Sequence, residues 1–152
     1  MKNILKAFAI ITDSNLGKEN LIRRYSIDEE RIHIIPFEPS IKLNNNNYKY
    51  KKLQKYSKLK PYIFYPAQYW PHKNHVYIIE GLKHLETKTN HNIKAIFTGN
   101  DKGNLSYLKN YAKKLSIDKK VYFMNFLPDE EISYLYKNCL AVVMPTYFGP
   151  TN

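Results

Sequence analysis

The chain has 152 residues, of which 43% are hydrophobic and 24% charged, and its formal net charge is +11 at pH 7. This composition is normal for a folded globular domain and excludes a wholly disordered chain, and no apolar run approaches the roughly 18 residues that a membrane-spanning helix needs. The first residues lack the apolar core and cleavage site of a signal peptide, and the single cysteine, Cys139, excludes an internal disulfide framework. We therefore expect a cytoplasmic chain, with the inner face of the membrane as the alternative location.

The excess of positive charge allows two interpretations. A basic chain can bind nucleic acid or another polyanion. Lys, Asn, Ile and Tyr are all abundant here, however, and all have A/T-rich codons, so a biased genome would give the same composition. We favour codon bias and do not expect nucleic acid as the partner. Tyrosines and lysines are concentrated at residues 48–60, which would suit peripheral contact with an anionic membrane or with nucleic acid, but a solvated linker is the favoured interpretation.

The first part of the chain predicts a strand, a helix and a second strand. Residues 7–12 are apolar, Ser14 is the expected N-cap, and residues 19–25 carry apolar side chains at helical spacing. Residues 32–35 are the next strand, which Pro36 ends. Strand, helix and strand joined by short connections predict a βαβ unit.

Residues 37–60 interrupt this pattern. Asparagines occupy positions 44–47, lysines follow, and neither the helical nor the strand period is present. We interpret the segment as a polar surface loop. It would separate residues 1–36, the start of a Rossmann-like domain, from residues 61–152, which form the core of that domain.

After residue 60, strands and helices alternate regularly. The expected strands are residues 62–65, 93–98, 121–126 and 140–144, and the expected helices are residues 76–85, 105–115 and a third from 129. Asn104 and Asp129 are the expected N-caps of the last two helices, and Glu130 and Glu131 suit the first turn of the third. Its buried stripe would be Ile132, Leu135 and Tyr136. The last strand is apolar throughout, as expected of a strand covered on both faces.

This alternation predicts an α/β fold with a Rossmann-like parallel sheet and helices on both faces. Because crossover connections between parallel strands are right-handed, all the strand-to-helix loops gather at the carboxyl edge of the sheet, where such folds bind ligands. Those loops are residues 68–74, 99–103, 127–129 and 145–152, and they hold most of the unusual polar residues. The sequence therefore predicts a site built from several loops.

Lys73 is the strongest site candidate, because it stands where the first of these loops meets a helix. An ammonium group and the free N–H groups of a helix start both favour an anion, and a phosphate is the natural ligand there. The alternative is a solvated surface lysine; neighbours that are Trp, Pro and His favour a function. His72 and His75 have no carboxylate or thiol to complete a metal set, so we expect hydrogen-bonding or capping roles for them.

Two other loops have a composition that suits ligand binding. The turn that begins with Gly99 would let backbone approach a ligand closely, and residues 145–152 are rich in turn formers and hydroxyls, as in an anion nest. No Ser/His/Asp set, paired cysteines or Walker-type glycine loop is present, which disfavours hydrolase and P-loop functions. No helix follows the last loop, so we expect the domain to be truncated at its C-terminus.

With these residues assembled, the chain resembles the C-terminal, donor-binding domain of the retaining glycosyltransferases of group 1 (family four), which have the GT-B architecture of two facing Rossmann-like domains. The match runs from about residue 9 to residue 152. Its most specific segments are PHKN at 71–74, IFTG at 96–99, the run from 121 to 132, and MPTYFG at 144–149. The resemblance implies that the chain is one half of a GT-B fold.

The resemblance also implies a function. The family transfers a sugar from a nucleotide-sugar donor to an acceptor, here a glycan or a lipid-linked molecule, with retention and without a metal or other cofactor. Negative charge develops on the departing diphosphate, and groups that bind this charge lower the barrier. Lys73 matches the lysine of the family's basic pair and would be the catalytic residue. The arginine position of that pair holds Gln68, a donor without charge.

Further donor-binding residues follow from the same resemblance. The backbone of Asn125, Phe126 and Leu127 would face the nucleobase. The other implied donor-binding residues are His72 and Asn74 beside the lysine, Gly99 and Asn100 in the donor cleft, Thr146 at the first position of the family's acidic pair, and Gly149, Thr151 and Asn152 with amides for the diphosphate. The acceptor-binding domain would precede this sequence, so we expect donor binding without turnover. The alternatives are a non-catalytic nucleotide- or polyanion-binding module and an inactive remnant.

Overall fold

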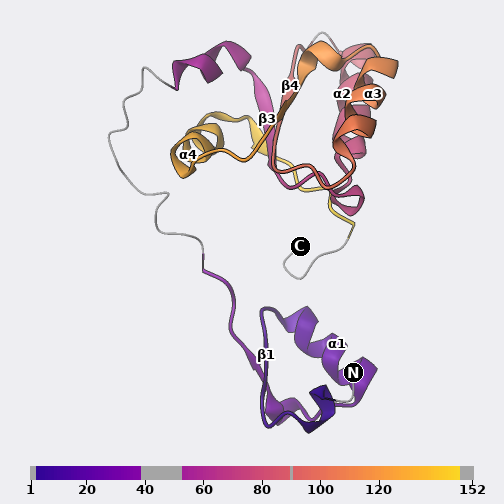
Figure 1. Cartoon of the computed structure of the whole chain (residues 1–152), viewed down its shortest axis with the longest axis vertical. Coiled ribbons are helices and arrows are strands. Elements are labelled where there is room, and N and C mark those ends of the chain that lie inside the picture. The colour runs from indigo at the N-terminus through magenta and orange to yellow at the C-terminus, as the bar shows by residue number, and fades with distance from the viewer. Residues whose placement is uncertain (1–2, 39–52, 90, 148–152) are drawn as a thin grey trace. The chain divides into compact units, whose positions relative to one another are not determined.

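The computed structural model of the chain describes residues 3–38, 53–89 and 91–147 (Figure 1). By its internal contacts the chain divides into two compact units, one up to Ser40 and one from Ile41 to Phe148. Each unit has its own parallel sheet, with two strands in the first unit and four in the second. The predicted parallel α/β arrangement is present in both units.

The first unit is a small βαβ arrangement, as predicted. It contains a 3-10 turn Ile4–Lys6, β1 Ile10–Thr12, α1 Asn15–Tyr25, a 3-10 turn Glu29–Arg31 and β2 Ile32–Ile34, and β1 pairs with β2 in parallel. The Ser14 side chain accepts a hydrogen bond from the Gly17 N–H at 3.2 Å, so the predicted N-cap is confirmed. The first strand is shorter than expected, and the expected strand residues 7–9 lie outside it.

The second unit alternates strands and helices around a four-stranded parallel sheet. Its elements are a 3-10 helix Gln54–Leu59, β3 Tyr62–Pro66, a 3-10 turn Pro71–Lys73, α2 His75–Lys88, β4 Lys94–Thr98, α3 Leu105–Lys114, a 3-10 turn Asp118–Lys120, β5 Val121–Met124, α4 Asp129–Asn138 and β6 Ala141–Val142. The strand order is β5-β4-β3-β6, and every pairing is parallel. The predicted α/β class and its carboxyl edge are both present.

The helices cover both faces of this sheet, as Figure 1 shows for α2 and α3 on one side and α4 on the other. Side chains alternate along a strand, so Tyr65 and Phe97 pack with α2 and α3, whereas Phe64 and Ile96 pack in a second cluster with Leu135 of α4. All five side chains are almost completely buried. Near-continuous apolar strands are expected where both faces are covered.

The expected polar loop at residues 37–60 is wrong from Leu53 onward. Leu53 and Tyr56 are buried in the second cluster, and the 3-10 helix that contains Tyr56 packs beside α4. The Tyr56 hydroxyl donates to the Glu131 carboxylate, and Lys55 forms an ion pair with the same carboxylate at 2.9 Å. The prediction failed because Leu53 and Tyr56 stand among lysines, so the local composition did not indicate that they are buried. Residues 39–52, including the asparagine tract, lie outside the described residues.

The last strand also differs from its prediction. β6 has two residues and pairs only with β3 among the described residues, so it is an edge strand. Leu140, Val142 and Met144 are 61%, 39% and 62% exposed, which contradicts burial on both faces. An apolar run is compatible with a central or an edge strand, and composition does not give its number of neighbours.

The helix starts are correct in position. Asn104 holds the predicted N-cap position of α3, whereas the predicted N-cap of α4 is wrong. The Asn104 side chain makes no capping bond; instead the Asp101 carboxylate accepts from the N–H groups of Gly103, Asn104 and Leu105 at 2.9, 3.2 and 3.1 Å. Pro128 occupies the N-cap position of α4, and Asp129 is its first residue. Glu130 and Glu131 lie in the first turn, as predicted.

The predicted buried stripe of α4 is only partly correct. Leu135 is fully buried and Ile132 is half-buried, whereas Tyr136 is 39% exposed and packs edge-on against Phe64. Ser133 is buried as well. The buried face of α4 is therefore centred on Leu135 and includes Ser133, and it does not extend fully to Tyr136 as predicted.

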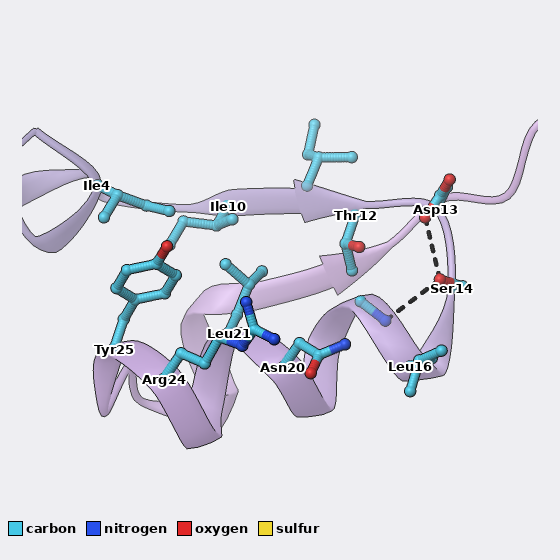
Figure 2. Close-up of a pocket in the computed structure, with 12 residues that line it drawn as sticks. Ile4, Ile10, Thr12, Asp13, Ser14, Leu16, Asn20, Leu21, Arg24 and Tyr25 are labelled. Carbon is cyan, nitrogen blue, oxygen red and sulfur yellow. Dashed lines mark hydrogen bonds between the residues drawn. The ribbon is translucent and has the colours of Figure 1, made fainter. Parts of the chain in front are cut away.

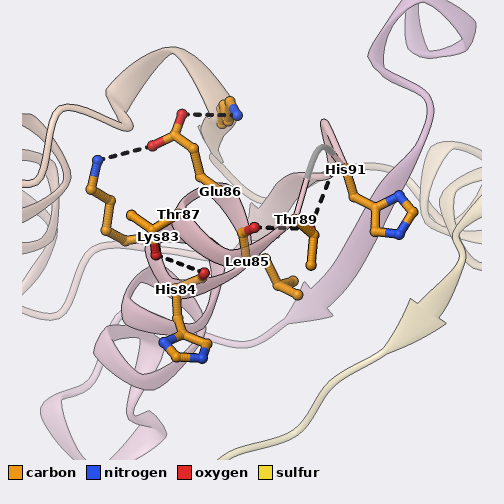
Figure 3. A network of polar contacts seen from close by, with 8 residues as sticks. Lys83, His84, Leu85, Glu86, Thr87, Thr89 and His91 are labelled. Atoms are coloured by element: carbon orange, nitrogen blue, oxygen red, sulfur yellow. Dashed lines mark hydrogen bonds and ion pairs between the residues drawn. The ribbon is translucent and has the colours of Figure 1, made fainter.

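The C-terminal end of α2 is tied to the turn before β5 (Figure 3). The Glu86 carboxylate forms ion pairs with Lys83 at 3.0 Å and with Lys120 at 2.9 Å. The Thr89 hydroxyl donates to the Leu85 carbonyl at 2.9 Å and satisfies one of the last carbonyls of the helix. These contacts fix the far end of α2, while its first turn lies at the carboxyl edge of the sheet.

Candidate functional site

Two of the predicted loops, residues 68–74 and 99–103, are joined by hydrogen bonds to each other and to the end of β5 at the carboxyl edge. The Gly99 N–H donates to the Met124 carbonyl at 3.1 Å, and the Tyr69 N–H donates to the Asn100 carbonyl at 3.1 Å. The buried Tyr69 hydroxyl bonds to the carbonyls of Phe97 and Met124 at 3.1 and 2.6 Å. The loop after β3 is therefore anchored to the ends of both β4 and β5. Burial raises the pKa of Tyr69 well above its usual value, so the hydroxyl remains a donor.

Gly99 permits the closest approach between these loops. A Cβ atom at this position would lie 2.5 Å from the Ala67 carbonyl oxygen and 2.8 Å from the Gln68 Cα. Both are backbone atoms and cannot move aside as a flexible side chain could. Glycine is therefore required here by the packing of the β3 loop on the end of β4.

The turn that carries Lys73 is joined to the loop after β6. The Asn74 side-chain amide donates to the Pro145 carbonyl at 3.1 Å, and the Tyr147 N–H donates to the His72 carbonyl at 3.1 Å. The Tyr65 hydroxyl lies 3.0 Å from the Lys73 carbonyl, to which it donates, and 2.7 Å from the Thr146 Oγ1. Four of the predicted site residues, namely His72, Lys73, Asn74 and Thr146, thus belong to one connected set of turns.

The start of α2 carries no negative charge of its own. Its N-cap, Asn74, has a left-handed backbone with φ 53°, no side chain caps the helix, and its first turn contains no acidic residue. The half-buried Lys73 directly precedes this N-cap. An uncompensated helix start beside an ammonium group favours an anionic ligand.

His75, the first residue of α2, is packed among aromatic rings. Its imidazole is fully buried, with ring centroids 4.9, 5.2 and 5.1 Å from those of Tyr65, Tyr69 and Phe97. Burial lowers the pKa of His75 to about 4; the Ala67 backbone opposes this shift, and the charge of Lys73 adds to it. Neither ring nitrogen has a hydrogen-bond partner of normal geometry among the described residues.

The expected hydrogen-bonding or capping role of His75 is therefore wrong. Its imidazole is a neutral packing element, because desolvation outweighs the weak attraction of the Ala67 backbone. The His72 ring, in contrast, stacks on Trp70, with centroids 6.1 Å apart and planes at 25°.

A pocket of about 280 Å³ lies beside Gly99. It is lined by Pro66, Ala67, Gln68, Thr98, Gly99, Phe126, Leu127, Asp129 and Ile132. Four of these, Gln68, Gly99, Phe126 and Leu127, were predicted from the sequence as donor-binding residues. Phe126 is 74% exposed and presents an aromatic ring at the rim.

The structure separates the predicted residues into two groups at one edge. Asn100 contributes its carbonyl to the Tyr69 N–H, and Asn125 is exposed directly after β5. Lys73 and Thr146 belong to the turns described above and do not line the pocket beside Gly99. Gly149, Thr151 and Asn152 lie outside the described residues, so their predicted amides remain a prediction.

The residues that hold the loops together were not predicted from the sequence. Tyr65 and Tyr69 were interpreted as strand and loop residues, and Asp101 as part of a turn, yet their polar atoms make the bonds that position the edge. The signal in the sequence was that Tyr65 and Tyr69 carry hydroxyl groups at positions where a phenylalanine would also fit the apolar pattern. Buried hydroxyls of this kind find partners.

A larger hollow of about 480 Å³ lies in the first unit, between β1 and α1 (Figure 2). None of the predicted site residues lines it. Several of its polar groups are occupied locally, because the Ser14 hydroxyl donates to the Asp13 carboxylate at 3.0 Å and accepts from the Gly17 N–H. Its size alone does not favour it over the edge where the predicted residues meet.

Residues 3–38, 53–89 and 91–147 contain neither a metal-binding cluster nor a helix that could span a membrane. No group of three or more His, Cys, Asp or Glu side chains could hold a metal ion. In the same residues, no helix combines the length and the apolar character that crossing a membrane requires.

The parallel sheet, the helices on both faces and the loops at its carboxyl edge define a Rossmann-like domain of the kind found in GT-B proteins. The family model of the glycosyl transferases group 1 matches residues 48–151, and the chain belongs to this family. The matched range does not include β1, α1 or β2, so the assignment of residues 1–36 to the start of the same domain stays a prediction. A comparison with curated protein sequences finds no match.

Solved structures agree with this fold. WaaG, a glycosyltransferase involved in lipopolysaccharide biosynthesis, is 18% identical with a TM-score of 0.74 over 90% of this chain and 38% of its own. Anabaena Alr3699/HepE in complex with UDP is 18% identical, with a TM-score of 0.78 over 95% of this chain and 40% of its own. A glycosyltransferase from Rickettsia africae ESF-5 is 20% identical, with a TM-score of 0.77 over 94% of this chain and 39% of its own. The chain thus spans about 40% of the length of these structures.

Proposed function

We propose that this chain is the donor-binding part of a retaining glycosyltransferase. It binds a nucleotide-sugar at the carboxyl edge of the second unit, and the sugar passes to a glycan or lipid-linked acceptor held by another domain. The observation that carries the proposal is the convergence of Lys73, the uncompensated start of α2 and the pocket beside Gly99 on one sheet edge.

The two groups of residues have different tasks in this proposal. The exposed Phe126 ring and the backbone of Asn125 and Leu127 take the nucleobase beside the pocket. Lys73 and the first N–H groups of α2 take the diphosphate, whose charge increases as the bond to the sugar breaks. Groups lower the reaction barrier when they bind the transition state, with its increased negative charge, more tightly than they bind the intact donor.

The relatives support the chemical class of donor and acceptor. HepE has been solved with UDP-glucose, and WaaG acts in lipopolysaccharide biosynthesis. We infer a nucleotide-sugar donor and a glycan-type acceptor for this chain, with no metal or other cofactor, because Lys73 and the helix start supply the positive potential. A cytoplasmic location, including the inner face of the membrane, fits such a donor.

Isothermal titration with nucleoside diphosphates tests the proposal. The chain should prefer one nucleoside diphosphate, and Lys73→Ala should weaken its binding by roughly tenfold or more, as expected for a charge-assisted contact. Lys113→Ala is the matched control, because Lys113 is exposed in the last turn of α3, at the opposite end of that helix from the carboxyl edge. Its affinity should equal that of the wild type.

The competing functions give different results in the same experiment. A polyanion-binding module predicts similar affinities for many anions and a steep dependence on salt. An inactive remnant predicts a chain that folds poorly and binds no ligand, which melting curves with and without the diphosphate would show. Equal weakening by both lysine substitutions would contradict a defined diphosphate site.

A further inference from the structure

Trp70 and Gln68 are paired twice at the edge of the sheet. The Trp70 backbone N–H donates to the Gln68 carbonyl at 2.7 Å, and the indole Nε1–H donates to the Gln68 Oε1 at 3.2 Å. Between them, Tyr69 is fully buried and bonded to the ends of β4 and β5. The two exposed side chains therefore flank a fixed residue and lie on the same outer side of the loop.

The indole determines which end of the Gln68 amide is available. An indole N–H is a donor only, so it must face the amide oxygen and not the amide nitrogen. This chemistry settles an orientation that is otherwise ambiguous for glutamine. The Nε2 group of Gln68 has no partner among the described residues, and Gln68 lines the pocket beside Gly99. The neutral Gln68 side chain thus keeps two N–H donors for a ligand.

Trp70 is itself held in place. Its ring stacks on His72, and the Lys102 Nζ lies 5.7 Å from the ring centroid. Pro71 follows it and starts the 3-10 turn that leads to Lys73. The indole consequently links the Gln68 amide to the turn that presents Lys73, and it brings the ammonium of Lys102 to the same rim.

We propose that Trp70 is a positioning residue for donor binding: its indole N–H holds the Gln68 oxygen, so that the Gln68 NH₂ group donates to an oxygen of the donor diphosphate. This inference rests on the proposed function and deepens it. Gln68 occupies the position where the family resemblance implies an arginine. A neutral amide donor held in one orientation thus takes the place of a charged one. The Trp70 indole sets the direction of the Gln68 N–H groups, whereas an arginine would present its N–H groups in a fixed planar geometry of its own.

A double-mutant cycle tests whether Trp70 acts through Gln68. Trp70→Phe keeps a ring for His72 and Lys102 but removes the indole N–H, and Gln68→Ala removes the amide. Titration of the 152-residue chain with UDP, ADP and GDP, each beside its parent nucleoside, identifies the preferred diphosphate. Each substitution should weaken that diphosphate about fivefold, within the range of one hydrogen bond, and leave the nucleoside affinity unchanged.

The double variant gives the decisive result. If Trp70 acts through Gln68, the double variant binds no more weakly than Gln68→Ala alone. Losses that multiply, or a Trp70→Phe chain that binds the diphosphate as the wild type does, would overturn the inference. Gln68→Glu should be weaker still, because its carboxylate accepts from the indole but repels the diphosphate.

A measurement on the wild type does not depend on the folding of a variant. The side-chain NH₂ signals of Gln68 in a ¹⁵N-edited NMR spectrum should shift with the preferred diphosphate and not with the nucleoside; unchanged signals overturn the inference. The two proposals fail differently. A folded chain that does not bind a diphosphate would contradict both proposals. If Lys73→Ala weakens diphosphate binding but Trp70→Phe does not, only the role of Trp70 is contradicted.

Discussion

The starts of α2 and α3 follow neighbouring strands at one sheet edge, yet their electrostatics are opposite. At α3, the Asp101 carboxylate accepts hydrogen bonds from three backbone N–H groups. These bonds, that from Leu105 most of all, hold the pKa of Asp101 below its usual value. At α2, no side chain caps the helix and no acid lies in its first turn. The α3 start has its own anion, and the α2 start is open for a bound one.

The largest effect is expected from Gly99→Ala, which forces apart the loops that precede both helices. The new Cβ would meet the Ala67 carbonyl, so the free energy of unfolding should fall by about 3 kcal/mol, as in overpacked cores. Urea denaturation measures this. Gly81→Ala is the control, because a Cβ there meets nothing within 4 Å and the helix should gain stability. A Gly99→Ala chain as stable as the wild type would refute the close packing of the loops.

Acid should weaken the α2 start before it affects the α3 start. The unfolded chain takes up a proton on His75 near pH 6.5, whereas the folded chain does so only near pH 4. Between these values the unfolded state binds more protons than the folded state. The free energy of unfolding therefore decreases as the pH is lowered from 6.5 to 4, by up to about 3 kcal/mol. Denaturation from pH 7.5 to 4 measures the loss. His75→Phe should keep the aromatic packing and abolish most of the dependence; an unchanged profile would contradict the buried neutral ring.

Asp101→Asn should lower the melting temperature at neutral pH. The folded-state pKa of Asp101 lies below its ordinary 3.8, so the stabilisation is complete above about pH 4 and is lost as pH falls further. The variant should therefore lose part of the acid dependence below pH 4, in a window separate from that of His75. Thermal melts of both chains at pH 7 and pH 3 test this; equal melting temperatures at neutral pH would argue against the cap.

The smallest effect uses a matched pair of exposed tyrosines at the third positions of the two helices. Tyr77→Glu places a carboxylate in the open start of α2 and should raise stability by about 0.5 kcal/mol while weakening diphosphate binding. Tyr107→Glu makes the same change in α3, where Asp101 already compensates the dipole, and should gain nothing. Equal gains would mean that the two helix starts do not differ.

The elements and their order were predictable because apolar periodicity reports local geometry. Strands β3 to β5 and helices α1 to α4 lie close to their predicted ranges. The edge position of β6 was not predictable, because an apolar run does not reveal how many neighbours a strand has. The burial of Tyr56 was not predicted for a related reason, since one of several tyrosines among lysines shows its burial only once α4 is packed against it.

The site was predictable at the level of loops and less so at the level of side chains. Parallel topology gathers strand ends at one edge, which is why Lys73 and Gly99 were expected together. Their division into a charged turn and a separate pocket depends on hydroxyl bonds from Tyr65 and Tyr69. Spacing along the chain carries no information about such contacts. The roles of the individual residues in donor binding stay predictions until they are measured.

The exposed edge of β6 has a practical consequence for anyone who purifies this chain. Among the described residues β6 is paired on one side only, and the apolar residues Leu140, Val142 and Met144 are exposed there; such an edge is a template to which another polypeptide can add. Concentrated samples should therefore self-associate through this border of the sheet, and a lysine in place of Val142 should keep them monodisperse in light scattering.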